Sequence, residues 1–116
     1  MDQPSALAAS IGIESIIVAI LLARLGWAKV RRGIAAATLG TIVTHPLAWW
    51  SIVALEPAIG YWAAVALVEA LVCLAESLAY RLLVPLAWPL ALAMSVAANA
   101  ASTLAGFLYY AYAGFF

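Results

Sequence analysis

The chain of 116 residues is 69% hydrophobic and only 9% charged, and its formal net charge is zero. A soluble domain carries about 25% charged residues, so this composition excludes a water-solvated globular surface. Five Lys and Arg residues are too few for a nucleic-acid surface, and the single Cys73 allows no intrachain disulfide. We therefore expect residues 1–116 to form one transmembrane domain with the lipid bilayer as its surroundings.

Four apolar segments follow one another, each at least as long as the roughly 20 residues that a helix needs to cross a bilayer. The predicted spans are about 5–27, 34–55, 61–84 and 90–114. Turn signals separate them: a basic loop at 29–33, Glu56-Pro57, and Pro85 with Pro89. Because such short connections force neighbouring spans to alternate in direction, the predicted fold class is all-α, an integral membrane bundle of four antiparallel helices.

The basic residues predict the orientation of this bundle. They fall at the junctions of spans one and two and of spans three and four, which antiparallel spans bring to the same side: Arg24, Lys29, Arg31, Arg32 and Arg81. The positive-inside rule makes that side cytoplasmic and places both termini outside, so we predict a multi-pass protein of the cytoplasmic (inner) membrane. Interfacial aromatic residues agree, with Trp27 and Trp88 inside and an outer belt of Trp49, Trp50, Tyr61, Trp62, Tyr109, Tyr110, Tyr112, Phe115 and Phe116.

Each span carries polar or small residues at helical spacing, so that they share one face. They are Ser10 and Glu14; Thr38, Thr41, Thr44 and His45; Glu69, Cys73, Glu76 and Tyr80; and Ser95, Asn99, Ser102 and Gly106. Small and hydroxyl residues let membrane helices approach closely, and we assign Ser95 and Gly106 to helix packing. An ionisable residue at the bilayer centre costs at least about 2.5 to 3.5 kcal/mol, so packing alone explains Glu14, His45, Glu69, Glu76 and Asn99 less well. The candidate site residues are Glu14, His45, Glu69, Glu76, Asn99 and Ser102.

Counting about 1.5 Å per residue from the outer boundary separates these candidates into two layers. Glu14, His45 and Glu69 are predicted near the midplane, and Glu76 and Asn99 nearer the cytoplasmic side. Glu69 and Glu76 are two turns, or roughly 10 Å, apart, so each is expected to belong to its own layer.

Three chemistries fit the first layer. Two carboxylates and an imidazole in a low-dielectric site can share a proton. Glu14, His45 and Glu69 could also ligate a divalent metal ion, although no second His and no standard ligand spacing accompany them; no other cofactor is predicted. A hydrolytic site would need an oriented nucleophile, for which Ser15, Ser77 and Thr44 are generic candidates.

The sequence resembles an uncharacterised group of small four-span bacterial membrane proteins. The resemblance rests on Glu14, on Thr44-His45-Pro46-Leu47-Ala48-Trp49, on the paired Glu69 and Glu76 with Tyr80, and on Asn99 and Ser102 with Gly106. It implies that these polar residues belong together and implies no activity. Glu14 also resembles the first-span glutamate of small multidrug-resistance transporters. This chain lacks the aromatic and glycine motifs of that family, and its five basic residues share one side.

Three functions follow as hypotheses. The first is a membrane protein with a buried Glu/His/Asn site that binds a proton or cation, coupled to the passage of a small solute. The second is a structural or assembly subunit, because small-residue faces suit packing against a second copy of the chain or a partner membrane protein. The third is an intramembrane metal-dependent enzyme, so enzymatic activity stays open.

Overall fold

The computed structural model describes residues 2–114, and within this range the chain is helical and contains no strand. Its elements are α1 (Gln3–Leu22), the short 3-10 helix η1 (Ala23–Leu25), α2 (Trp27–Ile59), α3 (Tyr61–Leu83) and α4 (Trp88–Tyr112). The four α-helices are long and apolar enough to cross a membrane, so the predicted all-α class and a multi-pass membrane protein are supported. Phe115 and Phe116 of the predicted aromatic belt lie outside the described residues.

Two glycines make the turns at either end of α2. Gly26 and Gly60 have φ angles of 99° and 83°, a backbone conformation that residues other than glycine rarely adopt. Because Gly26 turns the chain so early, the predicted basic loop at 29–33 is wrong: these residues form the first turns of α2, which suits the helix propensity of Lys and Arg. At the other end, α2 continues through Pro57 to Ile59, and the Gly60 N–H donates to the Glu56 carbonyl over 2.8 Å.

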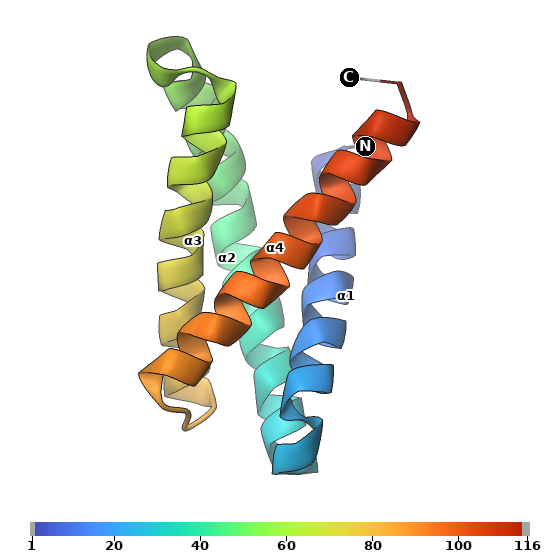
Figure 1. Ribbon diagram of the computed structural model, residues 1–116, viewed down its shortest axis with the longest axis vertical. Coiled ribbons are helices and arrows are strands. Elements are labelled where there is room, and N and C mark those ends of the chain that lie inside the picture. Colours follow the sequence, from blue (N-terminus) through green and yellow to red (C-terminus); the bar gives the residue numbers. More distant parts are fainter. Residues whose placement is uncertain (1, 115–116) are drawn as a thin grey trace.

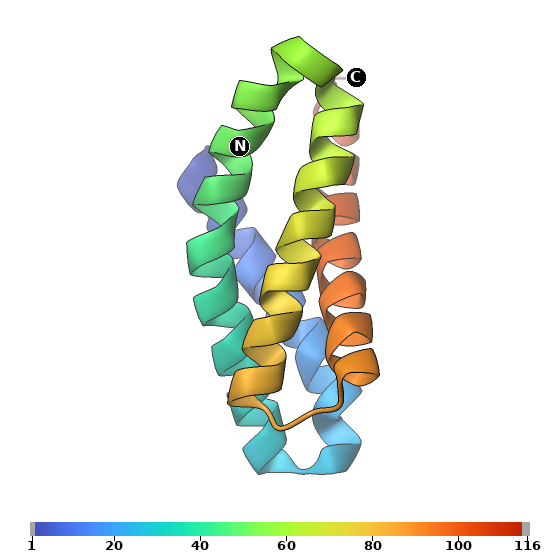
Figure 2. The same ribbon diagram turned by 90° about the vertical axis from the view of Figure 1, so that its left-hand side faces the viewer.

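The turns and the ends of the chain gather at opposite ends of the molecule (Figures 1 and 2). At one end, here called the turn end, lie η1 and the connection at 84–87, together with Arg24, Arg81 and the basic first turns of α2. At the other, here called the terminal end, lie Gly60, the start of α1 and the end of α4. The Lys and Arg residues are thereby concentrated at the turn end.

The four helices pack in a ring. Among the described residues, α1 contacts α2 and α4, and α3 contacts α2 and α4, whereas α1 and α3 do not pack on each other. Figure 1 shows α4 crossing the bundle diagonally, from the turn end of α3 to the terminal end of α1. Since α1 and α3 diverge toward the terminal end, the bundle is widest there.

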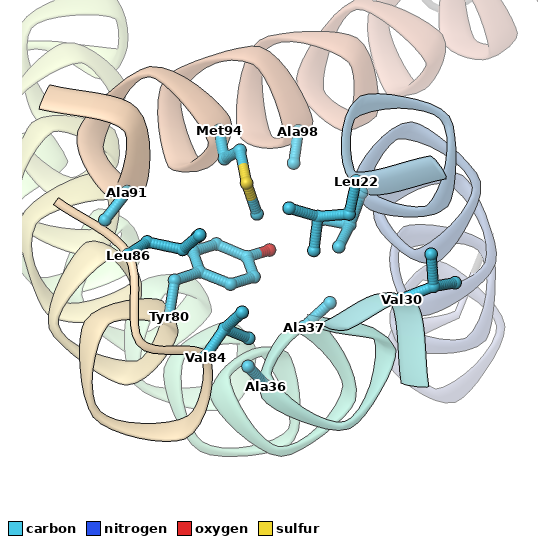
Figure 3. Packing of buried hydrophobic residues seen from close by; sticks show 11 residues of the cluster. Leu22, Val30, Ala36, Ala37, Tyr80, Val84, Leu86, Ala91, Met94 and Ala98 are labelled. Atoms are coloured by element: carbon cyan, nitrogen blue, oxygen red, sulfur yellow. The ribbon is translucent and has the colours of Figure 1, made fainter. Parts of the chain in front are cut away.

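The turn end is closed by an apolar cluster, here called the plug (Figure 3). It contains Val18, Leu22, Val30, Ala36, Ala37, Tyr80, Val84, Leu86, Ala91, Met94 and Ala98. Gly33 lets α2 approach α1 closely at this point, because a Cβ on Gly33 would overlap the side chains of Leu22 and Val18. The plug therefore closes one end of the bundle and leaves the polar residues on the other side of it.

The outer face of the bundle is apolar. Large side chains such as Trp27, Trp50, Leu82 and Tyr112 are exposed, the last with 96% of its surface free. A soluble monomer rarely exposes so much contiguous apolar surface. This surface suits a chain surrounded by lipid, where helices satisfy their backbone hydrogen bonds internally.

Candidate functional site

A cavity of about 330 Å³ lies between all four helices. The residues that line it extend from Ala6, Tyr61 and Tyr110 near the terminal end down to Thr41, Glu76 and Asn99 above the plug. All six candidate site residues line this one cavity: Glu14, His45, Glu69, Glu76, Asn99 and Ser102. Gly106 lines it as well, whereas Ser95 lies behind the cavity wall, bonded to α3.

The floor of the cavity joins two buried carboxylates through one hydroxyl. The Thr41 Oγ1 atom on α2 lies 2.5 Å from Glu14 Oε2 on α1 and 3.5 Å from Glu76 Oε1 on α3. All three side chains are at most 2% exposed. Thr41 therefore connects two helices that do not pack on each other.

Glu76 has further hydrogen-bond donors. The Thr44 hydroxyl donates to Glu76 Oε1 over 2.7 Å, and the Asn99 amide donates to Glu76 Oε2 over 2.6 Å. With Thr41, three donors from two helices converge on this carboxylate. An ionised carboxylate only accepts hydrogen bonds, so these surroundings suit a negative charge on Glu76. The residues Glu14, Thr41, Thr44, Glu76 and Asn99 are called the buried cluster below.

Local packing fixes the members of the buried cluster in place. The Asn99 amide also donates to the Ser95 carbonyl, one turn earlier on α4, over 2.9 Å. The Ser95 hydroxyl in turn donates to the Cys73 carbonyl of α3 over 2.7 Å, which ties the two helices together beside Glu76. On α2, Gly40 faces Glu76: a Cβ there would lie 3.4 Å from Glu76 Cγ, an ordinary van der Waals contact.

The upper cavity holds the remaining candidates. Ser102 of α4 donates to the hydroxyl of Ser10 on α1 over 2.9 Å, which closes the ring of helices. His45 and Glu69 are half-buried in the cavity wall, and the His45 ring lies 6.4 Å from the ring of Trp49. The buried Nε2 atom of His45 has no hydrogen-bond partner among the described residues.

The structure groups the carboxylates differently from the two predicted layers. Glu14 is hydrogen-bonded into the buried cluster with Glu76, not with His45 and Glu69. Counting residues from the outer end of each helix assumed that all helices begin at one level, whereas α1 begins closer to the turn end than the Gly60 turn does (Figures 1 and 2). Glu14 therefore lies nearer the plug than the count placed it.

The metal and nucleophile hypotheses find little geometric support. Among residues 2–114, no three His, Cys, Asp or Glu side chains come close enough together to hold a metal ion, so Glu14, His45 and Glu69 share a cavity without forming a ligand set. The Ser77 hydroxyl is buried and donates to the Leu74 carbonyl of its own helix over 2.8 Å. The Thr44 hydroxyl is bonded to Glu76.

Sequence reasoning placed Thr41 on the polar face of its span but did not assign it to the site. Its position one turn before His45 was the available signal, yet nothing in the spacing distinguished a bridging hydroxyl from a packing one.

Arg81 points away from the site. It donates to the Leu86 carbonyl over 3.1 Å, and its guanidinium lies 4.9 Å from the centre of the Trp88 ring.

Comparisons with protein-family models, with curated proteins and with solved structures find no match to this chain.

Proposed function

We propose that this chain is a four-span protein of the cytoplasmic membrane that binds a proton at the buried cluster and couples it to a small solute in the cavity above. Its spans are antiparallel, with the turn end in the cytoplasm and both termini outside. The concentration of Lys and Arg at the turn end supports this orientation through the positive-inside rule. The cavity then opens toward the outer side.

The observation that carries this proposal is the Glu14–Thr41–Glu76 bridge. Because Thr41 Oγ1 lies 2.5 Å from one carboxylate oxygen and 3.5 Å from the other, those two oxygens are no more than about 6 Å apart. At an effective dielectric constant of about 20, two negative charges at that distance repel by about 3 kcal/mol. Keeping one proton on the pair removes this repulsion.

The hydrogen-bond pattern favours Glu14 as the residue that holds the proton. Glu76 accepts from three donors, as an ionised carboxylate does, whereas Glu14 has the short contact to Thr41. A protonated Glu14 can donate to the Thr41 oxygen while the Thr41 hydroxyl donates to Glu76. Each group of the bridge then donates to the next, from Glu14 through Thr41 to Glu76.

A proton suits the buried cluster better than a metal cation does. A cation needs several oxygen lone pairs directed at one centre. Here hydroxyl and amide hydrogens from Thr44 and Asn99 already occupy lone pairs of Glu76. The donor groups therefore point at the carboxylate, whereas a metal site would direct acceptor atoms toward the ion.

The cavity supplies the place for a solute. A volume of about 330 Å³ is at the lower end of the range of small-molecule sites, and its wall combines aromatic rings with a few polar groups. Glu69, His45, Ser102 and Thr103 line the wall between the outer opening and the buried cluster. A solute bound there would lie directly above Glu14, where its binding can change the free energy of protonating this residue.

Infrared spectroscopy of the reconstituted protein tests the proposal. A protonated carboxylic acid in apolar surroundings has a carbonyl stretch that is separate from the carboxylate bands and shifts in D₂O. We expect this band in the wild type near neutral pH and its loss in Glu14→Gln. Glu56→Gln, a change at an exposed residue at the end of α2, is the matched control and should keep the band. A band that survives in both Glu14→Gln and Glu76→Gln would show that the buried cluster does not hold the proton.

A further inference from the structure

Tyr80 is the residue of the plug that packing alone does not explain. It is fully buried, and its hydroxyl has no hydrogen-bond partner among the described residues. An unpaired buried hydroxyl destabilises a protein, and Phe would fill the same space without that cost. A tyrosine at this position therefore points to a use for the hydroxyl.

The location of the hydroxyl suggests that use. Figure 3 shows the Tyr80 ring between Leu86 and Val84, with its oxygen directed into the centre of the plug toward Leu22 and Met94. In the plug as defined above, every other side chain is aliphatic or a thioether. The Tyr80 oxygen is thus a polar point inside the barrier between the cavity and the turn end.

Tyr80 also lies next to the buried cluster along α3. It lies four residues after Glu76 on α3, which places it on the same helix face about 6 Å closer to the turn end. The charged groups near enough to act on its hydroxyl are the carboxylates of Glu76 on α3 and Glu14 on α1. From α2 and α4 the plug contributes Ala, Val and Met side chains, none of which titrates.

We propose that the Tyr80 hydroxyl carries protons between the buried cluster and the turn end of the bundle. This role rests on the proposed proton site. A proton leaving the cluster reaches the Tyr80 oxygen through water and forms a new O–H bond there. The original O–H bond breaks, its hydrogen passes to a water molecule on the turn-end side, and the neutral phenol is restored. The plug blocks larger molecules, while one hydroxyl inside it lets a proton cross.

Proton flux into vesicles tests this role. The full chain is reconstituted into vesicles that contain a pH-sensitive dye, and a pH gradient is imposed with potassium and valinomycin present to remove the membrane potential. We expect the wild type to acidify the lumen faster than protein-free vesicles do, and Tyr80→Phe to reduce that rate at least tenfold. Tyr112→Phe, at an exposed tyrosine, and Met94→Leu, which alters plug packing without removing a hydroxyl, should keep the wild-type rate.

The infrared band of the protonated carboxylic acid separates this proposal from the one on which it rests. We expect the band to persist in Tyr80→Phe, which also shows that the variant is folded around an intact cluster. A band in both proteins with equal proton flux would overturn the role of Tyr80 and leave the proton site standing. Wild-type flux no faster than that of protein-free vesicles would also overturn the role of Tyr80. Absence of the band from the wild type would overturn the proton site itself.

Discussion

Glu14 and Glu76 share one hydroxyl although the helices that carry them, α1 and α3, do not pack on each other. The contact depends on α2, which packs on both helices and places Thr41 between the two carboxylates. The Glu14–Thr41–Glu76 bridge therefore forms only when α1, α2 and α3 are assembled, and Asn99 adds α4 to the buried cluster.

Thr41→Val removes this bridge while nearly preserving the volume of the side chain. We expect the infrared band of the protonated acid to shift, because Glu14 loses its nearest hydrogen-bond partner. Stability should fall by about 1–3 kcal/mol, the cost of leaving a buried polar group unsatisfied. The measurements are infrared spectroscopy and unfolding in detergent. Thr41→Ser keeps the hydroxyl and should behave like the wild type; a Val variant indistinguishable from the Ser variant would argue against the bridge.

His45 tests whether the imidazole belongs to the proton site, as the sequence suggested. In the structure it lines the cavity but has no hydrogen bond to Glu14 or Glu76. His45→Ala should therefore leave the infrared band of the protonated acid within a few wavenumbers of the wild type, whereas Glu76→Gln should change it. Loss of the band in His45→Ala would mean that the imidazole acts on the cluster directly.

Gly33 tests the close approach of α1 and α2. A Cβ at this position would overlap Leu22 and Val18 in the plug, so Gly33→Ala should destabilise the protein by about 1–3 kcal/mol, as overpacking does. Gly12→Ala is the matched control, since a Cβ there meets nothing within 4 Å and helix propensity favours Ala. Detergent unfolding of both variants gives the comparison, and equal stability would contradict the packing described for α1 and α2.

Asp2 gives a pH-dependent prediction at the start of α1. Its carboxylate accepts a hydrogen bond from the Ser5 N–H over 2.8 Å, and hydrogen bonding to Ser5 lowers the pKa of Asp2 below its usual value. Because the folded pKa is depressed, the cap stabilises the first turn above the ordinary pKa and is lost as the pH falls through the folded one. The protection factor of the Ser5 amide, the exchange rate of an unstructured amide at the same pH divided by its own, should fall in acid. In Asp2→Asn, which caps without titrating, the protection factor of Ser5 should not fall over this pH range.

The architecture was accessible from the sequence, and the detail of the site was not. Four apolar segments of sufficient length predict four helices, because a bilayer dictates both length and hydropathy. Periodicity likewise put Glu76 and Asn99 on polar faces that line one cavity. Periodicity did not show that Glu14 joins Glu76 through Thr41, because that contact depends on the level at which α1 packs against its neighbours, which a single helix does not determine. The early turn at Gly26 was missed for a simpler reason: basic residues at the N-terminal end of a helix oppose its dipole, so Lys29, Arg31 and Arg32 favoured a loop.

The diagonal course of α4 makes Asn99 a point about which this helix can rotate. Hydrogen bonds tie the first half of α4 to α3 through Ser95 and its second half to α1 through Ser102, with Asn99 between them. Tyr110 lies eleven residues beyond Asn99, about 16 Å along the axis, so a 10° swing of α4 about Asn99 would move the rim of the cavity at the terminal end by about 3 Å. Asn99 itself would hardly move. A small rotation of one helix can thus change the width of the opening while the amide stays on Glu76.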